Sequence, residues 1–146
     1  MNRRIAVRGI FVIEGKLLCA KLKPYNKERT EDFWCTPGGG VDDNEALIPA
    51  LEREIIEELG IKPLIGNLVF VQQFIGGGED NIEFFFHVLN PHDYLSIDLT
   101  KTSHGEAEIE SIDFINPGGH NVLPKFLTTE DFSDLENQPV KVFSYL

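Results

Sequence analysis

The segment that decides the fold begins with Gly39-Gly40-Val41-Asp42-Asp43-Asn44-Glu45 and continues, after seven residues, with Arg53-Glu54-Ile55-Ile56-Glu57-Glu58-Leu59-Gly60-Ile61. Its glycines predict a tight turn, and the apolar positions after the turn predict an amphipathic helix over residues 45–59. Glu54, Glu57 and Glu58 are spaced i, i+3 and i+4, so a helix places their carboxylates on one narrow face. An acidic ridge therefore follows directly after a glycine-rich turn.

The acidic ridge indicates a site for a divalent cation. Like charges at this spacing repel by about 0.2–0.5 kcal/mol per pair in an isolated helix, and a solvated acidic surface is their ordinary explanation. Here the glycine turn lets backbone approach a ligand closely, and Arg53 offers a planar cation that holds a carboxylate. All-oxygen ligand sets suit Mg²⁺, Mn²⁺ or Ca²⁺.

The order of elements predicts a sandwich of the α+β or α/β class, because strands lie both before and after the helix. Asn44 or Asp43 is expected to cap the helix, Pro49 to be tolerated in its first turn, and Gly60 to end it. A second helix is predicted at residues 124–135. Hairpins are predicted around Glu14-Gly15 and around 76–81. The predicted strands cover residues 5–13, 16–21, 33–36, 68–75, 82–89, 108–115 and 140–145.

The same segment resembles the Nudix box. Gly39, five residues, Glu45, seven residues and then the run 53–61 match that box at every fixed position, nine positions over twenty-three residues. The preceding Trp34-Cys35-Thr36-Pro37-Gly38-Gly39-Gly40 is similar to the aromatic and Pro-Gly-Gly lead-in of the family. The resemblance implies a Nudix-type α/β/α sandwich with a mixed β-sheet between helices, and residues 1–146 are expected to form a single domain.

The resemblance also implies a hydrolase of diphosphate linkages. Glu54 and Glu58 would be the principal ligands of Mg²⁺, for which Mn²⁺ could substitute, and the carbonyl of Gly38 would be a further ligand. Glu57 would join when more than one ion binds. Glu45 and Arg53 would pair and fix the geometry of the turn. Metal-bridged phosphate oxygens and water attack at phosphorus then give a phosphomonoester and a second phosphorylated fragment.

The general base is open between a box glutamate such as Glu54 and a glutamate in a later loop. Glu106 and Glu108, before the strand predicted at 108–115, are the best candidates outside the box. Glu79 and Glu83 are weaker candidates on the second hairpin. For any one of these residues a plain surface acid is the alternative, and His104 is expected to be a loop residue.

Substrate contacts are expected from a small basic cluster and from the glycine turn. Lys21 and Lys23, with Lys27 and Arg29, stand out in an acidic chain, and we expect Lys21 or Lys23 to contact phosphate. A solvating role is the equal alternative. Gly39 and Gly40 are expected to border the substrate. Aromatic residues at 33, 34, 74 and 84–86 could stack on a base, although aromatic side chains in strands more often belong to the core.

The resemblance names a chemistry without naming one substrate. The simplest substrate is a nucleoside triphosphate, with a nucleotide-sugar or ADP-ribose-like pyrophosphatase as the alternative. Gly76 and Gly77 occupy the region where ADP-ribose members commonly carry a proline. A non-catalytic module that senses a nucleotide is a third reading, against which the complete set Glu54, Glu57 and Glu58 argues. An enzyme that hydrolyses the diphosphate at an RNA end is disfavoured, because the net charge of the chain is −11 and repels RNA.

Composition excludes several other classes of protein. The 146 residues suffice for one core, and 13 basic against 24 acidic residues give a net charge of −11. That field opposes a long nucleic acid but admits a small nucleotide whose charge a metal ion offsets. Two cysteines make no disulfide framework, and no segment approaches the ~20 apolar residues of a membrane helix. We therefore expect no membrane partner and, by default, the cytoplasm; a homodimer is open.

Overall fold

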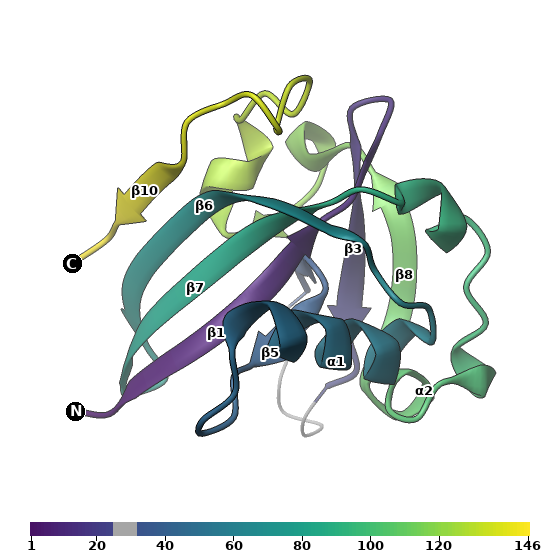
Figure 1. Cartoon of the computed structure of the whole chain (residues 1–146), viewed down its shortest axis with the longest axis horizontal. Coiled ribbons are helices and arrows are strands. Elements are labelled where there is room, and N and C mark those ends of the chain that lie inside the picture. The colour runs from purple at the N-terminus through teal and green to yellow at the C-terminus, as the bar shows by residue number, and fades with distance from the viewer. Residues whose placement is uncertain (25–31) are drawn as a thin grey trace.

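Two five-stranded sheets and one long helix form the part of the chain that the computed structural model describes, residues 1–24 and 32–146 (Figure 1). The first sheet has the order β10 (Lys141–Ser144), β6 (Ile65–Gly76), β7 (Glu79–Val88), β1 (Arg3–Ile10) and β5 (Gly38–Gly40). Its β1–β7 and β6–β10 pairs are parallel, whereas β6–β7 and β1–β5 are antiparallel. The sheet is mixed, and the predicted α+β class is confirmed.

The second sheet is built around β3 (Lys16–Leu22). This strand pairs with β2 (Val12–Ile13), β4 (Trp34–Cys35) and β8 (Ile109–Ile115), and β9 (Val122–Leu123) pairs with β4. The turns Glu14-Gly15 and Gly77-Gly78 close the β2–β3 and β6–β7 hairpins, and all four turn residues have positive φ. Positive φ at both central positions is what a type I′ hairpin turn requires. Both predicted hairpins therefore form. The strand predicted at 5–13 is divided into β1 and β2, and the other predicted strands are present with shifted ends.

Helix α1 (Leu47–Leu59) begins two residues later than predicted. Ala46 is its N-cap and makes no side-chain cap, so the predicted cap by Asn44 or Asp43 is wrong. The reason is a tight turn in which the Glu45 N–H donates to the Asp42 carbonyl and Asn44 takes a positive φ of 63°. Pro49 lies in the first helical turn, as predicted. Gly60 ends the helix with φ 79°, and its N–H donates to the Ile56 carbonyl.

Two apolar cores hold the layers together. In the first core the stripe of Leu51, Ile55 and Leu59 on α1 clusters with Val7 of β1, and α1 covers the first sheet at β1 and β5 (Figure 1). The second core lies between the sheets and joins side chains of β1, β6 and β7 to side chains of β3 and β8, namely Ile10, Val69, Phe70, Phe85, Leu17, Cys19 and Ile115. Strand β1 thus supplies side chains to both cores.

The predicted second helix at residues 124–135 is wrong. Only a 3₁₀ turn, η4 (Lys125–Thr128), forms there. The Thr128 hydroxyl donates to the Lys125 carbonyl, and the Ser133 N–H donates to the Asp131 carboxylate, which are local bonds that compete with a helix. The apolar side chains of this segment are buried in the second core without a helix, namely Phe126, Leu127, Phe132 and Leu135. The other short helical segments are α2 (Gly105–Glu108), η1 (Pro91–Tyr94), η2 (Leu99–Lys101) and η3 (Pro117–Gly119).

Both thiols are free, Cys19 buried and Cys35 half-buried. Burial raises the pKa of the Cys19 thiol to about 12, so this side chain behaves as an apolar structural residue. No helix among the described residues has the length and apolar character needed to span a membrane.

The burial of α1 predicts a contrast between two neighbouring isoleucines. Ile55 is 0% exposed and Ile56 is 43% exposed. Ile55→Ala leaves a cavity in the first core and should lower the free energy of unfolding by about 2–5 kcal/mol, whereas Ile56→Ala should change it by no more than about 1 kcal/mol. Urea denaturation of both variants measures the difference. Equal destabilisation by the two variants would contradict the assigned helix face.

Candidate active site

The turn before α1 is fastened to the helix by Arg53. Its Nε donates to Glu45 Oε2 at 2.8 Å and its Nη2 donates to Glu45 Oε1 at 2.9 Å, which makes a bidentate pair. Nη2 also donates to the Gly40 carbonyl at 3.2 Å. The hydrogen bond from Arg53, reinforced by one from the Asp42 N–H, lowers the pKa of Glu45 to about 2. The pairing that the family resemblance implied is therefore present.

The same guanidinium also holds two members of the acidic ridge. Its Nη1 donates to Glu54 Oε1 at 3.1 Å and to Glu57 Oε2 at 3.3 Å. Glu57 Oε2 lies 3.2 Å from His104 Nδ1 as well. The bonds from Arg53 to its carboxylate partners, that to Glu45 first, raise the pKa of Arg53. Glu57 is thus turned towards Arg53 and His104.

Glu54 and Glu58 line a cleft of about 610 Å³, called the acidic cleft below. It lies between α1, the glycines of β5 and the segment around α2, which contributes Glu108. The Glu58 residue is only 9% exposed. Burial, followed by the neighbouring charge of Glu54, raises the pKa of Glu58 to about 8, and the positive charge of Arg8 opposes this shift.

Two glycines let the turn approach these carboxylates. A Cβ on Gly39 would lie 2.5 Å from Glu54 Oε2. At Gly38, φ is +147° and a Cβ would collide with the Val7 carbonyl oxygen. A side chain at Gly39 would push the turn away from Glu54, and one at Gly38 would push β5 away from β1.

The donors at this place fit a divalent cation. Two carboxylates brought together away from water repel each other, and a cation between them offsets both charges. Mg²⁺ in proteins is commonly held by one or two carboxylates together with water and substrate phosphate oxygens. Gly38, whose carbonyl was predicted as a further ligand, borders the same cleft. Across residues 1–24 and 32–146, no three His, Cys, Asp or Glu side chains are grouped as a ready metal cluster.

The structure separates the two candidates for a general base outside the box. Glu108 lines the acidic cleft, and its charge contributes to the raised pKa of Glu58. Glu106 is exposed, as Glu108 is, but it is not part of the cleft lining. Its backbone carbonyl accepts a hydrogen bond from Lys23 Nζ, and Lys23 borders the cleft.

The predicted substrate contacts are separated in the same way. Lys21 lies away from the cleft lining, with its Nζ 2.7 Å from Asp32 Oδ1 and 5.0 Å from the centre of the Trp34 ring. Lys23, Gly39 and Gly40 all border the acidic cleft. The other two members of the basic cluster, at 27 and 29, lie outside the described residues.

A second cavity, which the sequence did not reveal, adjoins the acidic cleft. It has about 490 Å³ and lies between the sheets, where its lining includes Arg4, Arg8, Phe33, Gln72, Phe74 and Glu83. We call it the inter-sheet pocket. Glu83, a weak candidate for the general base, is 5% exposed here and accepts hydrogen bonds from Arg8 and Gln72. Of the aromatic residues considered for stacking, those at 33 and 74 line this pocket, whereas Phe85 and Phe86 are buried in the cores.

A sequence signal for this pocket existed but is weak. Arg8 interrupts the apolar run of β1. A charged side chain on the buried face of a strand needs a partner of opposite charge. That partner is Glu83, distant in sequence and brought near by the parallel pairing of β1 with β7. Pairing between strands is not readable from either segment alone.

Comparison with known proteins agrees with this geometry. A family model described as NUDIX domain matches residues 2–131. The 8-oxo-dGTP diphosphatase of Buchnera aphidicola subsp. Schizaphis graminum (strain Sg) is 40% identical over 58 residues. Those residues are 40% of this chain and 43% of that protein, so the match spans less than half of the relative's length.

Solved structures share the fold at low sequence identity. The E. coli ORF135 protein has a TM-score of 0.66 at 23% identity, covering 87% of this chain and 85% of its own. A MutT NUDIX hydrolase from Burkholderia pseudomallei has a TM-score of 0.62 at 23% identity, covering 80% and 85%. An ADP-ribose pyrophosphatase from Streptococcus suis 89-1591 has a TM-score of 0.61 at 14% identity, covering 96% and 98%. At these identities the likeness establishes the fold.

Removal of the Arg53 side chain should weaken both stability and the site. Arg53→Ala leaves the carboxylates of Glu45 and Glu54 without their main partner, and we expect a loss of about 1–3 kcal/mol in the free energy of unfolding. Lys62→Ala is the matched control. Lys62 is 70% exposed and pairs at 3.6 Å with Glu52, which lies on the same helix as Arg53. Thermal denaturation of both variants tests the expectation. A melting temperature of Arg53→Ala equal to that of the control would refute the anchoring role.

The raised pKa of Glu58 predicts a pH dependence of stability. Because the folded-state pKa of about 8 exceeds the ordinary 4.5, this group's contribution to stability is complete below about pH 4.5 and is lost as the pH rises through 8. Glu58→Gln cannot ionise. In buffer free of divalent ions, its melting temperature relative to the unmodified chain should therefore rise from about pH 5 to about pH 9. Melting curves across that range measure the trend, and a constant difference would contradict it.

Proposed function

This chain belongs to the Nudix family, whose model matches residues 2–131, and from that premise we propose that it hydrolyses the diphosphate linkage of a nucleoside triphosphate with Mg²⁺. The enzyme class, a Nudix pyrophosphohydrolase acting on nucleoside diphosphate derivatives, follows from the family and from its 8-oxo-dGTP diphosphatase relative. One observation carries the metal-dependent step: the buried Glu58 and the half-buried Glu54 line the same cleft beside the glycine turn.

Glu54 and Glu58 would hold the ion, with the Gly38 carbonyl as a third oxygen and Glu57 joining after turning away from Arg53. When bound, Mg²⁺ or Mn²⁺ supplies positive charge against the diphosphate oxygens. Gly39, with no side chain, lets the backbone lie close to Glu54, and Gly40 borders the same cleft, where the phosphates would bind. Lys23 adds a positive charge at the cleft border.

We assign the general base to Glu108. It faces the acidic cleft from the α2 side, opposite the carboxylates of α1. In the reaction a water oxygen forms a bond to phosphorus, its proton passes to the Glu108 carboxylate, and the bridging P–O bond breaks with its electron pair on the departing phosphate. Glu106 would instead position Lys23 through its carbonyl. Glu54 remains the alternative base within the box.

The substrate proposal is supported by charge and by the relatives. A net charge of −11 opposes a long polyanion, whereas a small nucleotide needs only the local cations. The relative described as an 8-oxo-dGTP diphosphatase acts on a nucleoside triphosphate, as its name states. Because one fold neighbour is described as an ADP-ribose pyrophosphatase, ADP-ribose-like diphosphates are the second candidate substrate. A single domain over residues 1–146, a homodimer and a cytoplasmic location stay predictions.

Substitution of Glu58 tests the metal-dependent step. Glu58→Gln keeps the side chain's shape but removes a ligand charge, so kcat should fall by about a hundredfold or more while the fold is retained. Glu52→Gln, on the same helix but outside the acidic cleft, is the matched control and should keep its activity. Phosphate release from a panel of nucleoside triphosphates and ADP-ribose, with and without Mg²⁺, is the measurement. Full activity of Glu58→Gln would overturn the assignment, and a panel without any turnover would favour a sensing module.

A further inference from the structure

The inter-sheet pocket continues directly from the acidic cleft. Four residues border both cavities: Arg4, Arg8, Cys35 and Thr36. A ligand with its diphosphate against Glu54 and Glu58 therefore has its remaining group next to the inter-sheet pocket. The pocket's volume of about 490 Å³ falls in the usual range for small-ligand sites.

The polar floor of this pocket is organised by Glu83. The Glu83 carboxylate accepts from Gln72 Nε2 at 2.6 Å and from Arg8 Nη2 at 3.3 Å, and Arg4 Nη1 lies 3.9 Å away. A carboxylate paired with arginines only accepts hydrogen bonds, so Gln72 must turn its NH₂ towards Glu83. The amide orientation is thereby fixed, and the Gln72 carbonyl Oε1 points away from Glu83. Gln72 lines the inter-sheet pocket, so this acceptor is available to a ligand there.

The floor also carries donors with unused capacity. Arg8 donates to the Thr36 carbonyl at 3.2 Å and to Glu83, which leaves further N–H groups of its five. Arg4 is more exposed, and its nearest carboxylate partner is at the limit of an ion pair. The Thr36 hydroxyl, in a residue 1% exposed, has no hydrogen-bond partner among residues 1–24 and 32–146. A buried polar atom without a partner beside a cavity points to a ligand.

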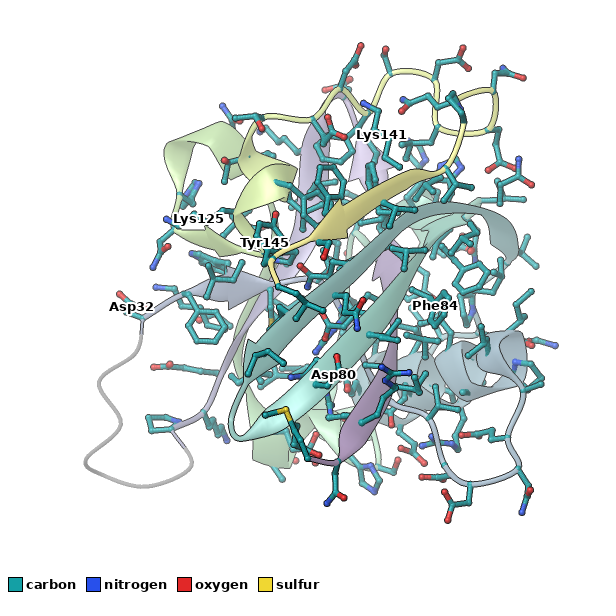
Figure 2. The ribbon with its side chains drawn as sticks, turned by 90° about the vertical axis from the view of Figure 1, so that its left-hand side faces the viewer. Asp32, Asp80, Phe84, Lys125, Lys141 and Tyr145 are labelled. Carbon is teal, nitrogen blue, oxygen red and sulfur yellow. The ribbon has the colours of Figure 1, made fainter. Side chains whose placement is uncertain are left out.

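The walls of the pocket are apolar and partly aromatic. Phe33 and Phe74 contribute rings, and Leu123 and Pro124 contribute aliphatic surface. Tyr145 and Lys125 complete the lining, and Figure 2 shows both on the side of the molecule where Asp32 lies. Such walls suit a flat ring, and the floor then contacts the polar edge of that ring.

We propose that the inter-sheet pocket selects nucleobases with a lactam edge, a carbonyl next to a ring N–H, and that Gln72 is the residue that determines this specificity. This inference rests on the proposed hydrolysis of a nucleotide. The base carbonyl accepts from Arg8 or Arg4, and the adjacent N–H donates to Gln72 Oε1. Guanine, uracil and thymine have this edge. Adenine and cytosine present a ring nitrogen without hydrogen there, next to an amino group that repels the guanidinium donors.

Glu83 is a positioning residue in this scheme. Its carboxylate oxygens are already taken by Gln72 and Arg8, and it acts by fixing the amide of Gln72 and the guanidinium of Arg8. Loss of its charge frees the Gln72 amide to rotate, which exchanges the acceptor for a donor at the ring edge. We therefore expect weaker discrimination between nucleobases rather than a slower rate of hydrolysis.

The test compares kcat and KM for GTP, UTP, ATP and CTP with Mg²⁺. The unmodified enzyme should favour GTP and UTP in kcat/KM by about tenfold or more. Gln72→Leu should remove that preference through a higher KM for GTP and UTP, and Glu83→Gln should weaken it in the same direction. Gln73→Leu is the matched control and should keep the preference, because Gln73 is the next residue on β6, donates to Asp80 and borders neither cavity.

Equal kcat/KM for GTP and ATP in the unmodified enzyme would overturn the inference and leave hydrolysis intact. So would a preference for ATP, or a preference that persists in a folded Gln72→Leu variant. Calorimetry with GMP and AMP in buffer free of divalent ions separates the two proposals. Tighter binding of GMP without turnover of any triphosphate would support the pocket and refute the hydrolase, whereas equal binding refutes the pocket whatever the turnover.

Discussion

The bidentate pair of Arg53 with Glu45 is the constraint on which the site depends. It ties the glycine turn to a helix residue two turns away, at N···O distances of 2.8 and 2.9 Å. The same guanidinium then fixes Gly40 and Glu54 relative to each other. Because a planar guanidinium has its donors in fixed directions, one side chain sets the geometry of turn and carboxylates together.

Strand β1 connects this arrangement to the rest of the molecule. Val7 packs in the core against α1, and its neighbour Arg8 lies on the other face of the strand, where it borders both cavities. This follows from the alternation of side chains along a strand. Strand β1 therefore positions the helix through Val7 and joins the acidic cleft to the inter-sheet pocket through Arg8. Any change that shifts β1 in register would move both cavities at once.

What the sequence could predict depended on how local the signal was. The signal was local for helix α1, for its end at Gly60 and for the Arg53–Glu45 pair. All three lie within 23 residues, and the spacing of those residues predicts their geometry. The cap at Asn44 failed, because Glu45 had a stronger partner in Arg53 and the turn closed earlier. The helix at 124–135 failed because local side-chain hydrogen bonds hold the segment in turns and its apolar residues are buried in the second core without a helix. Gln72 and Glu83 were missed as a pair, since only the β6–β7 register makes them neighbours.

The distribution of charge explains how an acidic chain can bind a polyanion of limited size. Of the few cations in a chain of net charge −11, Arg4, Arg8 and Lys23 border the acidic cleft, and Lys125 joins the two arginines at the inter-sheet pocket. Glu83 is the one carboxylate of the pocket lining that the described structure shows, so this pocket is locally positive. Attraction therefore acts over the length of one nucleotide, and beyond that length the acidic surface repels further phosphates. Ligand size is thus limited by charge placement as well as by shape.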